Sequence, residues 1–184
     1  MKRRDYYNYA NPKFSFMRDL MRKVMTAYGE AERFFATIKE KTWANFGLKA
    51  LTNYIHKLEH LQGDYVDTFK AILAEMGLEV EYPAVGELAE EMPDLDKVFE
   101  VCVGIVDDVD EALREFIGTI DGEHKQFSAL ARKMENLQMK NSAQRSFMLE
   151  AWNMADNNVS LSSLDNWVAR HAPYMKEEEE ADDE

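Results

Sequence analysis

The sequence predicts an all-α fold, in which four long helices form an antiparallel bundle and a short fifth helix follows. Two observations lead to this prediction. Four consecutive stretches carry apolar residues at alternating three- and four-residue spacing, and the eight glycines and four prolines mostly fall between these stretches. Amphipathic helices cannot bury their apolar sides alone, so the four must pack against one another. With 184 residues, 46% of them hydrophobic, the chain is long enough to form one such domain over residues 14–172.

The ends of the helices are predicted from proline, glycine and capping residues. Asn11-Pro12 marks the entry to the first helix, Gly47 bends the chain into the second, and Gly77 ends the second. Asp165 follows Ser162 by three residues, a spacing typical of a capping box, so the fifth helix is expected to open there. The four long helices are expected at residues 12–45, 48–77, 94–121 and 123–157.

The connections between the helices predict their arrangement. The first and third connections are short, whereas residues 78–92 separate the second helix from the third. One long middle connection is the arrangement of ferritin-like bundles. Inside this crossover, residues 85–91 are amphipathic and are expected to form a short two-turn helix. The apolar pattern of the fourth helix falters at Asn141 and Ser142, where we expect a kink or a change of register.

The stretch from Trp43 to Pro83 resembles a known family. It reads Trp43-Ala-Asn-Phe-Gly47, continues through a helix containing Asp64 and Asp67, and closes with Met76-Gly77 before Tyr82-Pro83. In order and spacing, residues 34–157 resemble the DNA-protection-during-starvation (Dps-like) branch of the ferritin superfamily. The resemblance implies a hollow homo-oligomeric shell of twelve subunits. It also implies a ferroxidase that oxidises and stores iron bound between subunits by His, Asp and Glu.

The chain departs from this family at most of the implied iron ligands. Thr42 stands where the family has a histidine, and Ala71 stands where it has a glutamate. The next expected histidine and aspartate fall near Thr52 or Tyr54 and near His56 or Leu58. Only Asp67 matches, and one carboxylate would bind ferrous iron too weakly to organise oxygen chemistry. The resemblance therefore implies a degenerate ferroxidase site, and whether the chain is an enzyme stays open.

A relocated metal site is predicted on the second helix. His56, His60, Asp64 and Asp67 stand at i, i+4, i+8 and i+11, which places them on one face, opposite much of the apolar stripe. Imidazole and carboxylate groups are suitable ligands for iron, zinc or manganese. The alternative is a hydrated surface stripe in which His60 and Asp64 form only an i,i+4 pair. His124 could supply a ligand from another helix or simply face solvent.

A di-iron site in the middle of the bundle is not predicted. Such sites use Glu-x-x-His motifs on inward-facing helix positions, and none of the helices carries this spacing. Cys102 lies on the apolar side of the third helix and is expected to be a small buried hydrophobe. The sequence also lacks a Gly-rich phosphate loop and a cysteine pair for zinc.

The two ends of the chain carry opposite charges. The formal net charge is −13, and seven acids crowd into residues 177–184. The tail at residues 173–184 is expected to be disordered, the alternative being that it binds a basic partner. The arm at residues 1–13 carries Lys2, Arg3 and Arg4 ahead of three tyrosines, and together these basic and aromatic residues could contact nucleic acid weakly. The acidic body of the chain opposes such contact.

Two classes of function follow. No apolar run approaches the ~20 residues that span a bilayer, and no signal-peptide core is present, so a cytoplasmic location without membrane contact is expected. The first hypothesis is a Dps-like or ferritin-like oligomer that sequesters iron for storage or stress protection, with weak or relocated iron oxidation. The alternative is a catalytically inactive bundle that acts as a structural or assembly component for a macromolecular partner.

Overall fold

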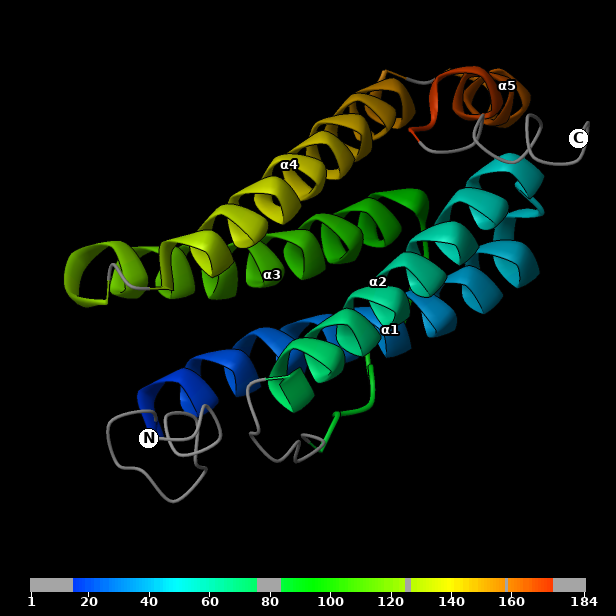
Figure 1. Cartoon of the computed structure of the whole chain (residues 1–184). Helices are drawn as coiled ribbons and strands as arrows, with labels where there is room; N and C mark the ends of the chain where they lie inside the picture. The colour runs from blue at the N-terminus through cyan, green and yellow to red at the C-terminus, as the bar shows by residue number, and fades with distance from the viewer. Residues whose placement is uncertain (1–14, 76–83, 125–126, 158, 174–184) are drawn as a thin grey trace, which may run out of the picture.

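The chain folds into a bundle of long helices closed at one end by a short helix. A computed structural model describes residues 15–75, 84–124, 127–157 and 159–173. These residues form, in order, α1 (Ser15–Phe46), α2 (Lys49–Glu75), α3 (Leu95–Glu123), α4 (Ser128–Asp156) and α5 (Leu161–His171). α1 lies beside α2 and α3 lies beside α4, with α5 at one end (Figure 1). The predicted all-α fold of four long helices and a short C-terminal helix is confirmed.

Several predictions concern residues beyond this description. The basic arm at residues 1–13, Gly77 and the acidic tail from residue 174 onward lie outside the described residues. The expectations for nucleic-acid contact through Lys2, Arg3 and Arg4 and for the acidic tail therefore stay predictions. Among the described residues, no helix is both long enough and apolar enough to cross a membrane.

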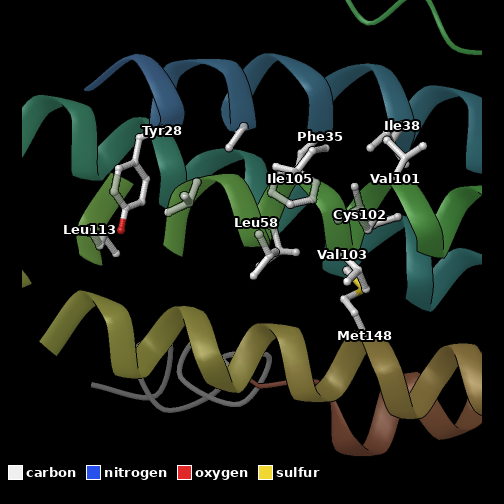
Figure 2. Packing of buried hydrophobic residues seen from close by; sticks show 14 of the residues in the cluster. Tyr28, Phe35, Ile38, Leu58, Val101, Cys102, Val103, Ile105, Leu113 and Met148 are labelled. Carbon is white, nitrogen blue, oxygen red and sulfur yellow. The ribbon is translucent and has the colours of Figure 1, made fainter. Parts of the chain in front are cut away.

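The apolar stripes predicted from the sequence form the core. Figure 2 shows side chains of α1 such as Phe35 and Ile38 facing Ile105 and Cys102 of α3, while Met148 of α4 reaches toward the same core. Burial of these side chains from water is the main force that holds such a bundle together. The α1 stripe is almost fully buried along its described length: Met17, Met21, Val24, Tyr28, Ala31, Phe35 and Ile38 are each at most 2% exposed.

The turn between α1 and α2 follows the predicted glycine rule. Gly47 has a φ of 63°, a left-handed conformation that only glycine adopts without strain. Its N–H donates to the carbonyl of Trp43 at 3.0 Å, which satisfies one of the free carbonyls at the end of α1. Leu48 then turns into the core, where it is 4% exposed. This two-residue link makes α1 and α2 antiparallel neighbours.

The fourth side of the bundle, between α2 and α4, is filled by large side chains. Cα atoms of these two helices stay more than 8 Å apart. Tyr54 of α2 bridges the space by an edge-on contact with Phe147 of α4, with ring centroids 4.7 Å apart. Trp167 of α5 stacks on Phe147 at 5.1 Å. The short C-terminal helix thus packs against both α2 and α4 at this end of the bundle.

Of the two alternatives expected at Asn141 and Ser142 of α4, the change of register is wrong, and the kink stays a prediction. The helix runs without interruption from Ser128 to Asp156, and Asn141 and Gln144 are buried at 4% and 1% exposure. Their spacing continues the helical repeat of buried positions from Met134 to Met148. The Asn141 side-chain amide donates to the carbonyl of Val106 at 2.8 Å. Because this hydrogen bond satisfies a buried polar group, an asparagine can occupy a core position there.

The short helix expected at residues 85–91 is also not formed. Residues 84–93 of the crossover lie along α1 without helical structure. Gly29 of α1 leaves space for Val85, and Arg33 forms an ion pair with Glu87 at 3.0 Å. Because polar side chains of α1 satisfy backbone carbonyls of the crossover, the segment does not need helical hydrogen bonds. These contacts run from Arg33 to Val85, from Lys41 to Glu90 and from Asn45 to Met92.

The start of α5 differs from the predicted capping box. The helix begins at Leu161, and Ser160 is its N-cap, because the Ser160 hydroxyl accepts a hydrogen bond from the backbone N–H of Ser163 at 3.2 Å. Asp165 lies one turn inside the helix and instead caps another one. Its carboxylate accepts hydrogen bonds from backbone N–H groups at the start of α2. Sequence spacing alone could not reveal a cap supplied by a distant helix.

Candidate metal centre

The face of α2 turned away from the core carries the four predicted metal-site residues. His56, His60, Asp64 and Asp67 are all exposed to solvent. The opposite side of the same helix is buried through Leu51, Ile55, Leu58, Gln62 and Phe69. The helical repeat therefore places the four residues on one accessible face, as the spacing predicts. The structure then divides them into two groups.

His56 and His60 form the first group. Their Nε2 atoms lie 3.3 Å apart, and their ring centroids are separated by 4.5 Å. The i,i+4 spacing brings the two rings together on consecutive turns. The His56 side chain is 48% exposed, so an ion in solvent can reach the pair.

A carboxylate and an ammonium group hold His56 in place. The Glu59 Oε2 atom lies 2.9 Å from His56 Nδ1 and 2.7 Å from the Lys39 ammonium of α1. Partial burial alone would raise the pKa of Glu59, but hydrogen bonds from Lys39 and His56 outweigh it and lower the pKa. Glu59 is therefore an ionised acceptor. Its i+3 spacing from His56 was visible in the sequence, whereas the part played by Lys39 depends on how α1 pairs with α2.

The second group is an acidic groove. Asp64 and Asp67 line an open depression of about 300 Å³ together with His60, and Glu32 of α1 closes its other side. A Cβ atom at Gly63 would lie 2.8 Å from the Glu32 carboxylate, so the glycine leaves room for Glu32 against α2. Asp67 forms an ion pair with Lys70. The groove could hold a hydrated cation, with part of its negative charge already neutralised by that lysine.

These groups do not converge into one multi-ligand site. In the described parts of the chain, no three His, Cys, Asp or Glu side chains are placed to hold a single metal ion. His124 ends α3 and stacks on Phe16 of α1, with ring centroids 3.7 Å apart. Thr42, at the position of the family histidine, is fully buried at 0% exposure. The local geometry therefore supports a two-histidine contact and a neighbouring acidic groove.

The middle of the bundle does not fit a di-iron centre. Apart from tyrosines, the buried polar side chains of the described residues are three amides and one threonine hydroxyl, namely Gln62, Asn141, Gln144 and Thr42. Ferritin-like di-iron centres use inward-facing glutamate and histidine, which bind iron far better than neutral amides. Desolvation raises the pKa of the buried Tyr28 phenol, with smaller contributions from Tyr65 and Asp110, so that phenol stays protonated.

Two of the acids of α3, Asp107 and Glu115, join this helix to its neighbours. Asp107 binds Arg145 of α4 through two contacts, at 2.6 and 3.2 Å. Glu115 pairs with Lys23 of α1. The pKa of Asp108 is raised, first by burial and then by the neighbouring carboxylates of Glu111 and Asp107. Asp107 and Glu115 are thus paired with cations of two different helices, which does not favour a convergent metal site on this face.

Comparison with solved structures identifies the fold. A closed form of the Archaeoglobus fulgidus ferritin, made by site-directed mutagenesis, matches with a TM-score of 0.73 and 14% identity, over 85% of this chain and 96% of that chain. M. penetrans ferritin matches with a TM-score of 0.76 and 14% identity, over 85% and 95%. A ferritin variant soaked in iron matches with a TM-score of 0.70 and 12% identity, over 82% and 98%. No protein-family model and no curated protein matches the chain.

The likeness covers nearly the whole of each ferritin. The fold of this chain is therefore a ferritin-like helical bundle, as the long middle connection predicts. At 12–15% identity, the likeness establishes the fold alone.

Proposed function

We propose that this chain is a ferritin-type subunit that assembles with copies of itself and sequesters metal cations, iron among them, at its surface. The observation that carries the proposal is the coverage of the structural match, since the chain aligns with 95% or more of each of these ferritins. The α2 face supplies a place for the cation. Its two imidazoles and the carboxylates of the adjoining groove are all solvent-accessible.

Self-assembly is supported by an exposed aromatic residue. Trp43, near the end of α1, is 56% exposed, although large aromatic side chains usually bury most of their surface. A second subunit could cover this indole. The Dps-like identity rests on Trp43-Gly47 and Asp67, but the crossover helix expected there is absent from residues 84–93. We therefore propose a ferritin-like subunit with a degenerate site. Dps-like stress protection is a more specific function within this proposal.

Iron oxidation in this proposal is weak and occurs away from the bundle core. The core supplies no inward-facing carboxylate among the described residues, so oxygen chemistry would depend on Fe(II) held at the α2 face. Such a site would show slow formation of Fe(III) that depends on His56, His60 and Asp67.

The experiment exposes the wild-type protein and two variants to Fe(II) in air and measures the iron that each retains after desalting. The first variant carries His56→Ala, His60→Ala and Asp67→Ala. The control carries His171→Ala and Glu150→Ala, which are exposed changes on α5 and α4. The proposal expects iron retention after desalting that the first variant loses and the control keeps. Equal retention by all three, or none by the wild type, contradicts it.

The second candidate is an inactive bundle that serves as an assembly component. It is favoured by the polar core without carboxylates and by Lys39 and Lys70, whose positive charges lie beside the acids of the α2 face. Under this alternative, the α2 variants would assemble as the wild type does, and iron would be handled no differently from buffer.

A further inference from the structure

We infer that His56 and His60 form a two-histidine site for a divalent transition-metal ion of the zinc class, bound by the two Nε2 atoms. This inference deepens the proposed function and rests on it for the role of the ion. Metal binding at this site depends only on four side chains of α1 and α2. The ligands are His56 and His60, and the positioning residues are Glu59 and Lys39.

The separation of the two nitrogens already suits an ion. Zinc–imidazole bonds are about 2.0–2.1 Å long, and a tetrahedral angle between two of them sets the nitrogens about 3.3–3.4 Å apart. The observed Nε2 to Nε2 distance is 3.3 Å. Both ligands stand on one rigid helix, one turn apart, so binding needs little reorganisation of the backbone.

The hydrogen bond at the other ring nitrogen fixes the tautomer of His56. An ionised carboxylate only accepts hydrogen bonds, so the 2.9 Å contact with Glu59 requires the proton to be on His56 Nδ1. The Nε2 lone pair of the neutral ring is then free to bind a metal. A carboxylate that orients a histidine in this way is the usual outer partner of a metal-bound imidazole.

The short distance between the two Nε2 atoms also requires a proton or a cation between them. Two lone pairs cannot face each other at 3.3 Å without repulsion, so one ring must donate a proton to the other or both must bind a cation. With Nδ1 of His56 already protonated, the neutral pair places this proton on Nε2 of His60. A bound ion would replace it, after a change of tautomer in the exposed His60 ring.

The charges around the pair permit a cation. The Lys39 ammonium lies 3.3 Å from His56 Nδ1, the ring nitrogen that does not bind the ion in this site. Its charge is compensated by Glu59 at 2.7 Å. Asp64 and Glu32 line the groove that continues from His60 and add negative charge to the approach. Water would complete the coordination, since no third protein ligand is placed there among the described residues.

The ligand type selects the ion. Two neutral imidazoles favour zinc, copper, nickel and cobalt over ferrous iron and manganese, and they bind magnesium poorly. The tetrahedral separation fits zinc and cobalt best. The pair therefore differs in ion preference from the carboxylate groove beside it, where oxygen ligands suit harder cations.

The test is a titration of the full-length protein with Zn²⁺ by calorimetry, in a buffer that does not bind metals. His60→Ala removes one of the two ligands, and Glu59→Gln keeps both while removing the carboxylate that orients His56. We expect His60→Ala to weaken binding by about 10-fold or more and Glu59→Gln to weaken it by about 10-fold. His171→Ala is the matched control, because it removes an exposed histidine from α5 and should leave the affinity unchanged.

Cobalt supplies a second readout. Co²⁺ bound by the pair should give the intense visible absorption of a low-coordinate site, and His56→Ala should abolish it. Circular dichroism melting curves show whether each variant is folded. Absence of Zn²⁺ binding in the wild type, or equal binding by wild type and His60→Ala, overturns the inference.

The result is separable from the test of the proposed function. Zinc binding by the histidine pair in a protein that neither assembles nor retains iron would support this site and refute the proposed function. Iron retention by an assembled protein whose Zn²⁺ affinity does not depend on His60 would support the proposed function and refute the two-histidine site.

Discussion

The carboxylate of Asp165 in α5 accepts a hydrogen bond from the backbone N–H of Leu51 at the start of α2, at 3.0 Å. It also accepts one from Ala50 at 2.8 Å. The free N–H groups and the positive end of the helix dipole both favour a carboxylate at this place. The side chain therefore caps a helix that lies more than a hundred residues earlier in the sequence. It ties α5 to the end of the bundle.

Replacing Asp165 by alanine is expected to lower the free energy of unfolding by about 1 kcal/mol, the typical value of an N-cap interaction. The loss arises because two N–H groups of α2 lose their acceptor. Asp165→Asn should lose less, since an amide oxygen can still accept these bonds. Asn166→Ala changes the exposed neighbour and is the control. Chemical denaturation measures all three, and an Asp165→Ala protein as stable as the wild type would contradict the cap.

Gln62 is a second site at which stability can be predicted. It is 2% exposed, and its Oε1 atom has no hydrogen-bond partner. A buried polar group without a partner is costly, so an apolar side chain of similar size should be better tolerated. Gln62→Met is expected to raise the free energy of unfolding by about 1 kcal/mol.

The contrast for Gln62 is Asn141, whose amide donates to Val106. Asn141→Leu should destabilise the protein, because it removes a satisfied hydrogen bond and forces a larger side chain into the core. Thermal unfolding of both variants gives the comparison. A Gln62→Met protein that melts well below the wild type would show that the glutamine has an essential partner.

Cys102 should be chemically inert in the folded protein. The side chain is fully buried, and this burial raises its pKa to about 12. Since only the thiolate reacts rapidly with thiol reagents, labelling should require unfolding. Reaction with a chromogenic disulfide under native and denaturing conditions measures this directly. Rapid labelling of the native protein would mean that α3 opens readily at this position.

The pair formed by Asp156 and Asp96 predicts a pH dependence. A hydrogen bond with Asp96 is the main cause that raises the pKa of Asp156, with smaller effects from desolvation and the charge of Asp96. Because the pKa is higher in the folded protein, the protonated form stabilises the fold. That contribution is complete below the unfolded pKa and is lost as the pH rises through the folded pKa.

The corresponding test uses Asp156→Asn. Its stability relative to the wild type should increase as the pH rises from about 3 to 7, since aspartate normally titrates near 3.9. Glu150→Gln, an exposed change on the same helix, is the control. Denaturation curves collected across this range measure the difference. A constant difference between wild type and Asp156→Asn would show that the two carboxyl groups do not interact.

The long helices could be predicted because their apolar positions repeat with the helical period. The stripe from Met17 to Ile38 is buried as expected, and Gly47 marks the turn by its positive φ. The crossover could not be predicted from its own residues. Its amphipathic pattern favours a helix, but hydrogen bonds from Arg33, Lys41 and Asn45 of α1 stabilise a non-helical path. Asp165 shows the same limit, because its partners belong to another helix.

The candidate site was predictable in part for a related reason. Spacing along α2 predicts that His56 and His60 share one face, and the structure brings their rings together. Spacing cannot predict Lys39 or Glu32, which come from α1. It also does not reveal that Asp67 is paired with Lys70. The ligands of a surface site are thus visible in the sequence, whereas the groups that orient or neutralise them depend on how the helices pair.

The most direct test of a metal-sequestering assembly is a native mass spectrum of the full chain after anaerobic exposure to Fe(II). One spectrum reports the number of subunits and the bound metal together. We expect an oligomer of the 21.4 kDa chain that carries iron, and we expect the variant with His56→Ala, His60→Ala and Asp67→Ala to lose the iron while it stays assembled. A monomer without iron, or an oligomer whose iron content is unchanged in that variant, would contradict this expectation.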